Sequence, residues 1–83
     1  MTLADSIREH VAVRILELAR RRGEARISVR AGDVHAAMGL RNRMPAVYSA
    51  LDAQKFLVEQ RLRLVDRSGP KHGATTTWIW GLR

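Results

Sequence analysis

The chain has no cysteine and few aromatic residues. Its 83 residues include two tryptophans, one tyrosine and one phenylalanine. Without thiols, neither a disulfide framework nor a thiolate metal site is available. No apolar run is long enough to span a bilayer, and the first residues lack the basic-then-apolar layout of a secretory signal. We therefore expect one domain, residues 1–83, with no membrane segment and a location in the cytoplasm or at the nucleoid.

The sequence also lacks a pattern of residues suited to catalysis or metal binding. Its three histidines, His10, His35 and His72, are far apart and do not have the paired spacing of metal ligands. No serine has the setting of an activated nucleophile. The pattern predicts a protein that is not an enzyme, with no cofactor, no metal and no small-molecule substrate.

Positive charge is what the sequence has in excess. Lysine and arginine number 15 against 8 acidic residues, which gives a formal charge of +7. Thirteen of these cations are arginines, whose planar fork suits phosphate and guanine. Residues 1–25 carry +1, whereas residues 26–83 carry +6. The excess favours a polyanionic partner, above all nucleic acid, over the simpler alternative that it serves only solubility.

The first third of the chain predicts one amphipathic helix. Thr2 and Asp5 fit a capping box at its start, and Gly23 fits a left-handed cap at its end. Apolar residues recur at three- and four-residue steps between them, which is helical spacing. The stripe that we expect in the core consists of Ile7, Val11, Ile15 and Leu18, and Ala12, Leu16 and Ala19 widen it to one side.

Two further helices are predicted in the middle of the chain. A short strand at 27–29 precedes a second helix over 31–38, which Gly39 closes. A third helix is predicted over about 42–54, with Asn42 as its N-cap. After it, the chain returns to the core at Phe56 and Leu57. The inner positions of the third helix are Met44, Val47, Tyr48 and Leu51.

The last third of the chain predicts a β-hairpin. Residues 62–65 form one strand, 66–74 the connecting loop and 75–80 the second strand, which is rich in β-branched and aromatic residues. Trp78 and Trp80 face the same side because they are two positions apart. We expect them in the core, and an exposed surface for a partner is the alternative.

The order helix, short strand, helix, turn, helix, strand, loop, strand resembles the winged helix-turn-helix family over nearly the whole chain. The resemblance is carried by that order, by the glycine turn and by the charged loop. It implies an α+β fold of three helices and a C-terminal β-hairpin. It also implies that helix 42–54 enters the DNA major groove and that loop 66–74 is the wing, which contacts the backbone or the minor groove.

The stretch from Gly39 to Pro45 places basic side chains at the start of the third helix. Arg41 and Arg43 match the acceptors of guanine, and Asn42 matches adenine. The N–H groups of a helix start also attract phosphate. Solvated arginines and a capping Asn42 are the alternative. The outward face of this helix is mostly small, which leaves Ser49 as the remaining candidate reader of bases.

Other DNA contacts are implied by the resemblance alone. In the wing these are Arg67, Lys71 and His72, and before the second helix Arg30 touches phosphate. From its charge, Asp52 is expected at the edge of the groove or outside it.

We therefore expect a small transcriptional regulator whose partner is double-stranded DNA. A homodimer would double its short footprint. Three alternatives stay open: an architectural protein that coats DNA with low sequence preference, RNA binding through the same surface, and a protein-interaction module. In the last, Trp78, Trp80 and Val13 would be exposed.

Overall fold

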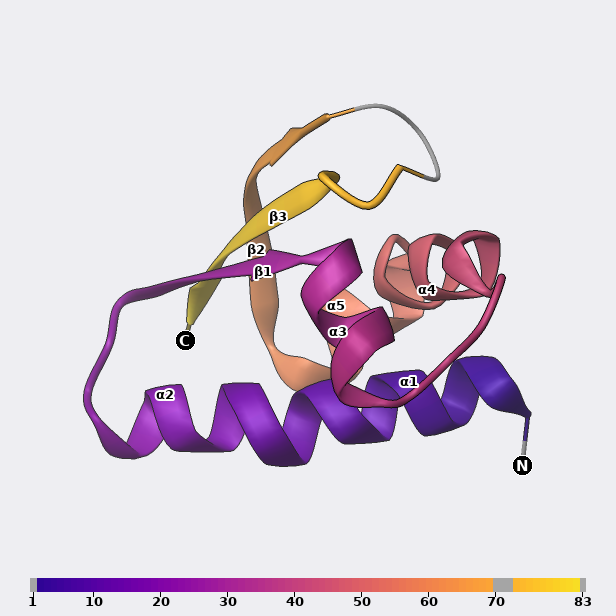
Figure 1. The fold of residues 1–83 in the computed structure, drawn as a ribbon. Coiled ribbons are helices and arrows are strands. Elements are labelled where there is room, and N and C mark those ends of the chain that lie inside the picture. Colours follow the sequence, from indigo (N-terminus) through magenta and orange to yellow (C-terminus); the bar gives the residue numbers. More distant parts are fainter. Residues whose placement is uncertain (1, 70–72, 83) are drawn as a thin grey trace.

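The computed structural model describes residues 2–69 and 73–82. A long helical rod lies along one side of the molecule, and the other helices and the sheet lie above it in Figure 1. The elements in chain order are α1 (Leu3–Val11), the π-helical turn η1 (Ala12–Leu16), α2 (Glu17–Arg21), β1 (Arg26–Arg30), α3 (Ala31–Ala37), α4 (Met44–Leu51), α5 (Gln54–Gln60), β2 (Leu62–Ser68) and β3 (Thr77–Leu82). The fold is α+β, as predicted.

The rod begins with the predicted capping box. The Thr2 hydroxyl accepts a hydrogen bond from the Asp5 N–H, and the Asp5 carboxylate accepts one from the Thr2 N–H, each at 3.1 Å. These two bonds lower the pKa of Asp5 below its ordinary value of 3.8, with the backbone bond from Thr2 the larger cause. Arg8 then joins Asp5 to the carbonyl of Ala50 at the end of α4. The cap therefore also fixes the rod against α4.

The π-helical turn η1 changes which residues of the rod are buried. Bonding from i to i+5 adds about one residue to that turn, so the inward stripe shifts along the chain. After Val11 the buried positions are Leu16 and Ala19. Ile15 is only partly buried and Leu18 is 44% exposed, so the predicted inward position of Leu18 is wrong.

The predicted third helix over 42–54 is the shorter α4 in the structure, and a further helix, α5, covers Gln54–Gln60, so the prediction of three helices is corrected. α4 begins at Met44 and ends at Leu51, and Ala53 then has extended backbone before α5 begins. No glycine or proline marks this break, which is why the spacing did not reveal it. Phe56 on α5 is buried and packs edge-on against Trp80, with ring centroids 5.6 Å apart.

The sheet is three-stranded and antiparallel, in the order β1-β3-β2. β2 continues to Ser68 and β3 begins only at Thr77, so the loop predicted over 66–74 begins later, at Gly69, and ends at 76. Trp78 and Trp80 stack on each other at 6.2 Å and are completely buried. Their predicted place in the core is confirmed, and the alternative that they form an exposed surface is wrong.

Candidate nucleic-acid interface

The turn between α3 and α4 is built from two left-handed residues. Gly39 has a φ of +66° and Asn42 a φ of +53°, a region that glycine and asparagine tolerate best. His35 of α3 holds the far end of the turn, because its Nε2 accepts a hydrogen bond of 3.2 Å from the Arg43 N–H. Both ends of the turn are thereby attached to α3, which sets the position of Arg41 and Arg43.

The N-cap of α4 is Arg43, so the predicted capping role of Asn42 is wrong. Asn42 lies one position earlier in left-handed backbone, and no side chain caps the helix. The amide of Asn42 makes no hydrogen bond within residues 2–69 and 73–82, so its donor and acceptor both face outward unused. The capping alternative for Asn42 is therefore excluded, and base reading by this residue stays a prediction.

The backbone at the start of α4 offers less to a phosphate than the sequence suggested. Pro45 has no N–H, and the N–H groups of Ala46 and Val47 both donate to the Arg43 carbonyl, at 3.0 and 3.1 Å. Only the Met44 N–H of the first turn is left. The positive character of this helix start therefore comes from the arginine side chains.

Both arginines of the turn are exposed. Neither Arg41 nor Arg43 forms an ion pair within the described part of the chain. Of the four residues predicted for the inner stripe of α4, Val47, Tyr48 and Leu51 are buried, whereas Met44 is only partly buried. Ser49 is exposed on the opposite face, as expected of a residue that could reach a base.

Arg67 of β2 is bound within the molecule. Its Nη1 donates to the carboxylate of Asp52, and its guanidinium lies 5.8 Å from the centre of the Tyr48 ring. The same carboxylate oxygen accepts a hydrogen bond of 3.3 Å from Trp78 Nε1. The bond to Asp52 raises the pKa of Arg67 further above its already high value. Asp52 and Arg67 thus join the end of α4 to the hairpin.

This pairing alters what was expected of both residues. The negative charge of Asp52 is balanced by Arg67, so it repels a nearby phosphate less than an isolated carboxylate would. Contact between Arg67 and DNA stays a prediction, since a phosphate would have to share this guanidinium with Asp52. The other predicted wing residues, Lys71 and His72, lie outside the described residues.

Arg30 lies at the junction of β1 and α3, where it is the N-cap position of α3. Its guanidinium is half-exposed and lies 3.8 Å from the carboxylate of Asp33, a loose pair. Close by, the Gly32 N–H donates to the Ala74 carbonyl at 2.9 Å. A Cβ at Gly32 would lie 2.8 Å from that oxygen, so a side chain here would push the end of the loop away.

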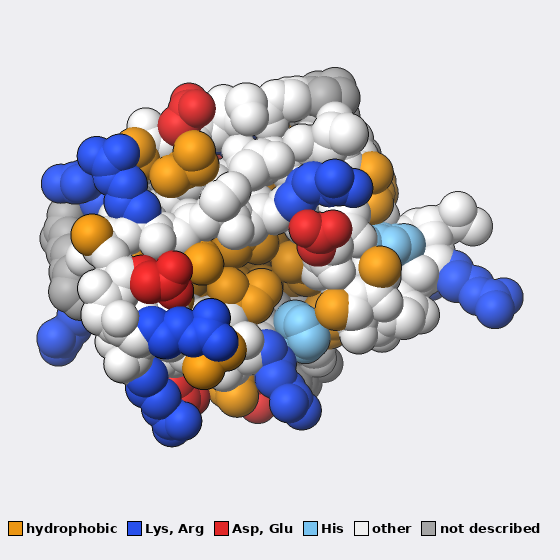
Figure 2. Space-filling model, turned by 60° about the vertical axis from the view of Figure 1, so that its left-hand side comes forward, with side chains coloured by type: hydrophobic (Ala, Val, Ile, Leu, Met, Phe, Trp, Pro, Cys, Tyr) orange, Lys and Arg blue, Asp and Glu red, His pale blue; other side chains and the backbone are white. Residues whose placement is uncertain are grey.

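A hollow that the sequence did not predict opens between the rod and the β1–α3 junction. Figure 2 shows hydrophobic side chains at its bottom, and basic, acidic and histidine side chains around it. Its volume is about 600 Å³, and its lining consists of His10, Arg14, Ile15, Ser28, Val29, Arg30, Asp33, Val34 and Ala37. Three separate elements form its walls, so no periodicity within one element could indicate it.

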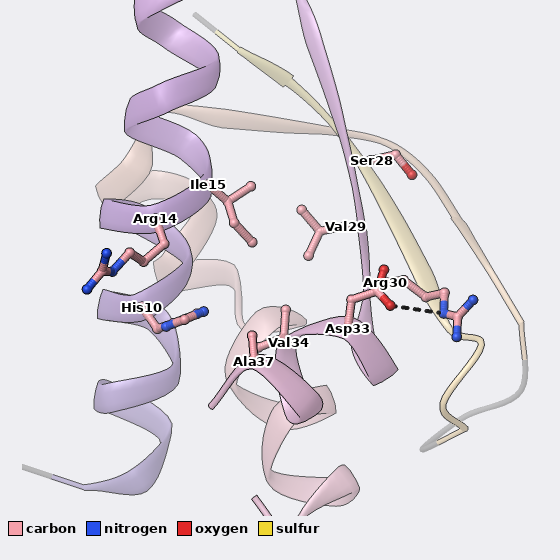
Figure 3. A pocket seen from close by; sticks show the side chains of 9 residues that line it. All are labelled: His10, Arg14, Ile15, Ser28, Val29, Arg30, Asp33, Val34 and Ala37. Carbon is pink, nitrogen blue, oxygen red and sulfur yellow. Dashed lines mark ion pairs between the residues drawn. The ribbon is translucent and has the colours of Figure 1, made fainter. Parts of the chain in front are cut away.

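The side chains of the hollow divide into a floor and a rim. In Figure 3, Ile15 on the rod and Val29 on β1 point toward each other, while the guanidinium of Arg14 points away. Arg30 and Asp33 lie at the opposite rim, joined by their ion pair. The hollow therefore combines an apolar floor with charged edges.

Comparison of the chain with models of known families, with curated proteins and with solved structures gave no match. Within the described residues, no group of three or more histidine, aspartate or glutamate side chains could hold a metal ion. None of the described helices has the length and apolar character to cross a membrane.

Proposed function

We propose that the chain is a winged helix-turn-helix domain that binds double-stranded DNA. The order of elements and the sheet order β1-β3-β2 support this assignment. In it, α3, the glycine turn and α4 are the helix-turn-helix, and the β2–β3 hairpin is the wing. The reading helix is α4, Met44–Leu51, which is shorter than the helix expected from the sequence.

One observation carries the proposal: the side chains of Arg41, Asn42 and Arg43 are exposed and make no hydrogen bond or ion pair within residues 2–69 and 73–82. They lie at the start of a helix whose other side is buried in the core. Side chains at this end of a reading helix reach base edges in the major groove. Arginine binds guanine and asparagine binds adenine through paired hydrogen bonds. Ser49 lies further along the same exposed side of α4.

Base recognition and binding of the DNA backbone are assigned to different side chains. Pro45 and Ser49 are small and exposed, so α4 approaches the bases closely but carries few groups that discriminate among them. Lys71 and His72 of the wing, with Arg67 where Asp52 permits, bind the backbone beside it. We therefore propose a transcriptional regulator with a short site, for which a homodimer would provide two half-sites.

The test is a fluorescence-anisotropy titration of a labelled random-sequence duplex over a series of salt concentrations. Affinity should fall steeply and log-linearly with salt, because binding releases counterions from phosphate. Absence of binding at low salt contradicts the proposal. Selection from a random DNA pool should then yield a short consensus that Arg43→Ala blurs, whereas Lys71→Ala weakens binding evenly on all sequences.

A second candidate, an architectural protein of low sequence preference, is favoured by the small outward face of α4. It predicts that Arg43→Ala and Lys71→Ala cause equal losses on every duplex tested. It also predicts that selection yields no consensus. The two candidates share the same surface, so only this sequence dependence separates them.

A further inference from the structure

β1 lies at the edge of the sheet and pairs with β3 alone within the described part of the chain. The pairs that continue this ladder at its two ends are hydrogen-bonded, since Leu82 N–H donates to the Ala25 carbonyl and Ala31 N–H to the Thr76 carbonyl. Bonded pairs alternate in an antiparallel ladder. Ile27 and Val29 are therefore the residues of β1 that bond to β3.

The intervening residues present their backbone groups to the free edge. Arg26 and Ser28 direct both N–H and C=O outward, and Arg30 directs its N–H outward because its carbonyl begins α3. All three residues are exposed. A free edge of this kind is a template for an added strand.

This free edge borders the hollow. Ser28, Val29 and Arg30 form one wall of it, and Ile15 on the π-helical turn faces them from the rod. The turn that moved Leu16 into the core also left Ile15 only partly covered, and such turns occur frequently at functional sites. A strand added to β1 would direct alternate side chains over this apolar floor.

The charges at the free edge of β1 indicate which kind of segment would bind there. Arg26 and Arg30 point to the outer face of β1, whereas the guanidinium of Arg14 points away from the hollow. Asp33 is the one acidic residue in the lining, and it lies 3.8 Å from Arg30. Arg26 has no ion pair among the described residues. The edge is therefore complementary to an acidic chain.

The same arginines disfavour a second copy of this protein as the occupant. Two copies of β1 paired antiparallel about Ser28 would set Arg26 of each copy opposite Arg30 of the other. Like charges directly opposite each other destabilise a strand pair. Charged edge residues are a common means of preventing such self-pairing.

We propose that β1 and the hollow are the docking site for an extended segment of an acidic partner protein, which adds as a fourth strand. Its sequence alternates as acidic, apolar, any residue, apolar, acidic. The two apolar side chains cover Ile15 and Val29, and the two acidic side chains pair with Arg26 and Arg30. Backbone bonds at Arg26, Ser28 and Arg30 supply the register. This site is independent of the proposed DNA contact at α4.

The first experiment uses a fluorescent nine-residue peptide with Glu-Val-Thr-Val-Glu at its centre, capped at both ends. It should bind the intact chain saturably, whereas a scrambled peptide of equal charge should not. Ser28→Pro removes the central N–H of the free edge and leaves the ladder to β3 intact, so peptide affinity should fall about tenfold or more. Ser28→Ala is the matched control and should bind as the parent does.

The second experiment separates strand addition from unspecific charge. Arg26→Glu with Arg30→Glu should abolish binding of the acidic peptide and confer binding of the same peptide with lysines in place of glutamates. This charge exchange also tests strand addition if Ser28→Pro fails to fold. Near-ultraviolet circular dichroism of the buried tryptophans reports whether that variant is folded. Equal binding of the scrambled peptide, or of Ser28→Pro in its folded state, would overturn the proposal.

A third outcome distinguishes a protein partner from nucleic acid. If the double charge reversal removes duplex binding and the acidic peptide does not bind the parent chain, the edge is part of the DNA surface and the proposal is wrong. If the chain binds no DNA yet binds the peptide, the docking site stands and the proposed DNA function fails. The two proposals are thus tested separately.

Discussion

The start of α4 and the free edge of β1 are both basic, but they differ in shape and in what lies beneath the charges. At α4, Arg41 and Arg43 project from a turn above a helix with a small outward face. At β1, Arg26 and Arg30 border an apolar hollow and an unpaired strand edge. Positive charge alone therefore does not identify a partner: a projecting helix start fits a groove, whereas a hollow beside a strand edge fits a peptide.

The largest expected effect comes from reversing the charges of the turn. Arg41→Glu with Arg43→Glu should lower duplex affinity about 100-fold or more, because two potential guanine contacts become repulsive. Affinity for the acidic peptide should not change. The matched control is Arg21→Glu with Arg22→Glu, two exposed residues at the end of α2 with the same change in net charge. An equal loss in both double variants, measured by anisotropy, would mean that only total charge matters.

The next effect concerns how the hairpin is attached to α4. Asp52→Ala leaves the buried Trp78 N–H without its acceptor, which should cost about 1–3 kcal/mol of unfolding free energy. Arg67→Ala removes only the exposed partner of Asp52 and should cost clearly less. Urea unfolding of both variants gives the comparison. A larger loss from Arg67→Ala would show that the guanidinium, and not the indole, holds the hairpin.

A smaller difference is expected between the two buried tryptophans. Trp78→Phe removes a hydrogen bond to Asp52, whereas Trp80 Nε1 is buried with no partner among the described residues. Trp78→Phe and Trp80→Phe remove the same atoms, so the difference between their unfolding free energies isolates the contribution of the hydrogen bond. Trp78→Phe should be the more destabilising by about 1 kcal/mol. Equal unfolding free energies would indicate that the 3.3 Å contact contributes nothing.

The smallest effect is the acid response of the capping box. Because folding lowers the pKa of Asp5, its contribution is fully present above its ordinary value of 3.8 and is lost as pH falls through the lower folded value. The protection of the amides in the first turn of α1 against exchange should therefore fall as the pH drops below the folded pKa of Asp5. Asp5→Asn should show no such step. A step of equal size in that variant would assign it to another group.

Local features of the sequence predicted a large part of the fold. The capping box of Thr2 and Asp5 and the left-handed cap at Gly23 depend on neighbours within a few residues, and both predictions are confirmed. Three of the four predicted inner positions of α4 are also buried, and the core position of the two tryptophans is confirmed. The exposed Arg41 and Arg43 were found for the same reason, since a glycine turn before an apolar stripe marks a helix start.

The features that the sequence did not predict depend on contacts between distant elements. The π-helical turn leaves Leu18 exposed, and no residue type marks this turn. α5 follows α4 without a glycine or proline, so its packing against Trp80 rather than its composition defines it. The partnership of Asp52 with Arg67 joins residues 15 positions apart, and the hollow requires three elements together. Spacing within one segment contains none of this information.

The most direct test of the two-surface account is a pair of titrations followed by amide resonances of the folded chain, first with a short duplex and then with the acidic peptide. We predict that the duplex shifts the resonances of residues 41–49 and leaves those of 26–28 in place, and that the peptide does the reverse. A duplex that perturbs residues 26–30 while the resonances of 41–49 stay unchanged would contradict the central claim that the start of α4 reads DNA.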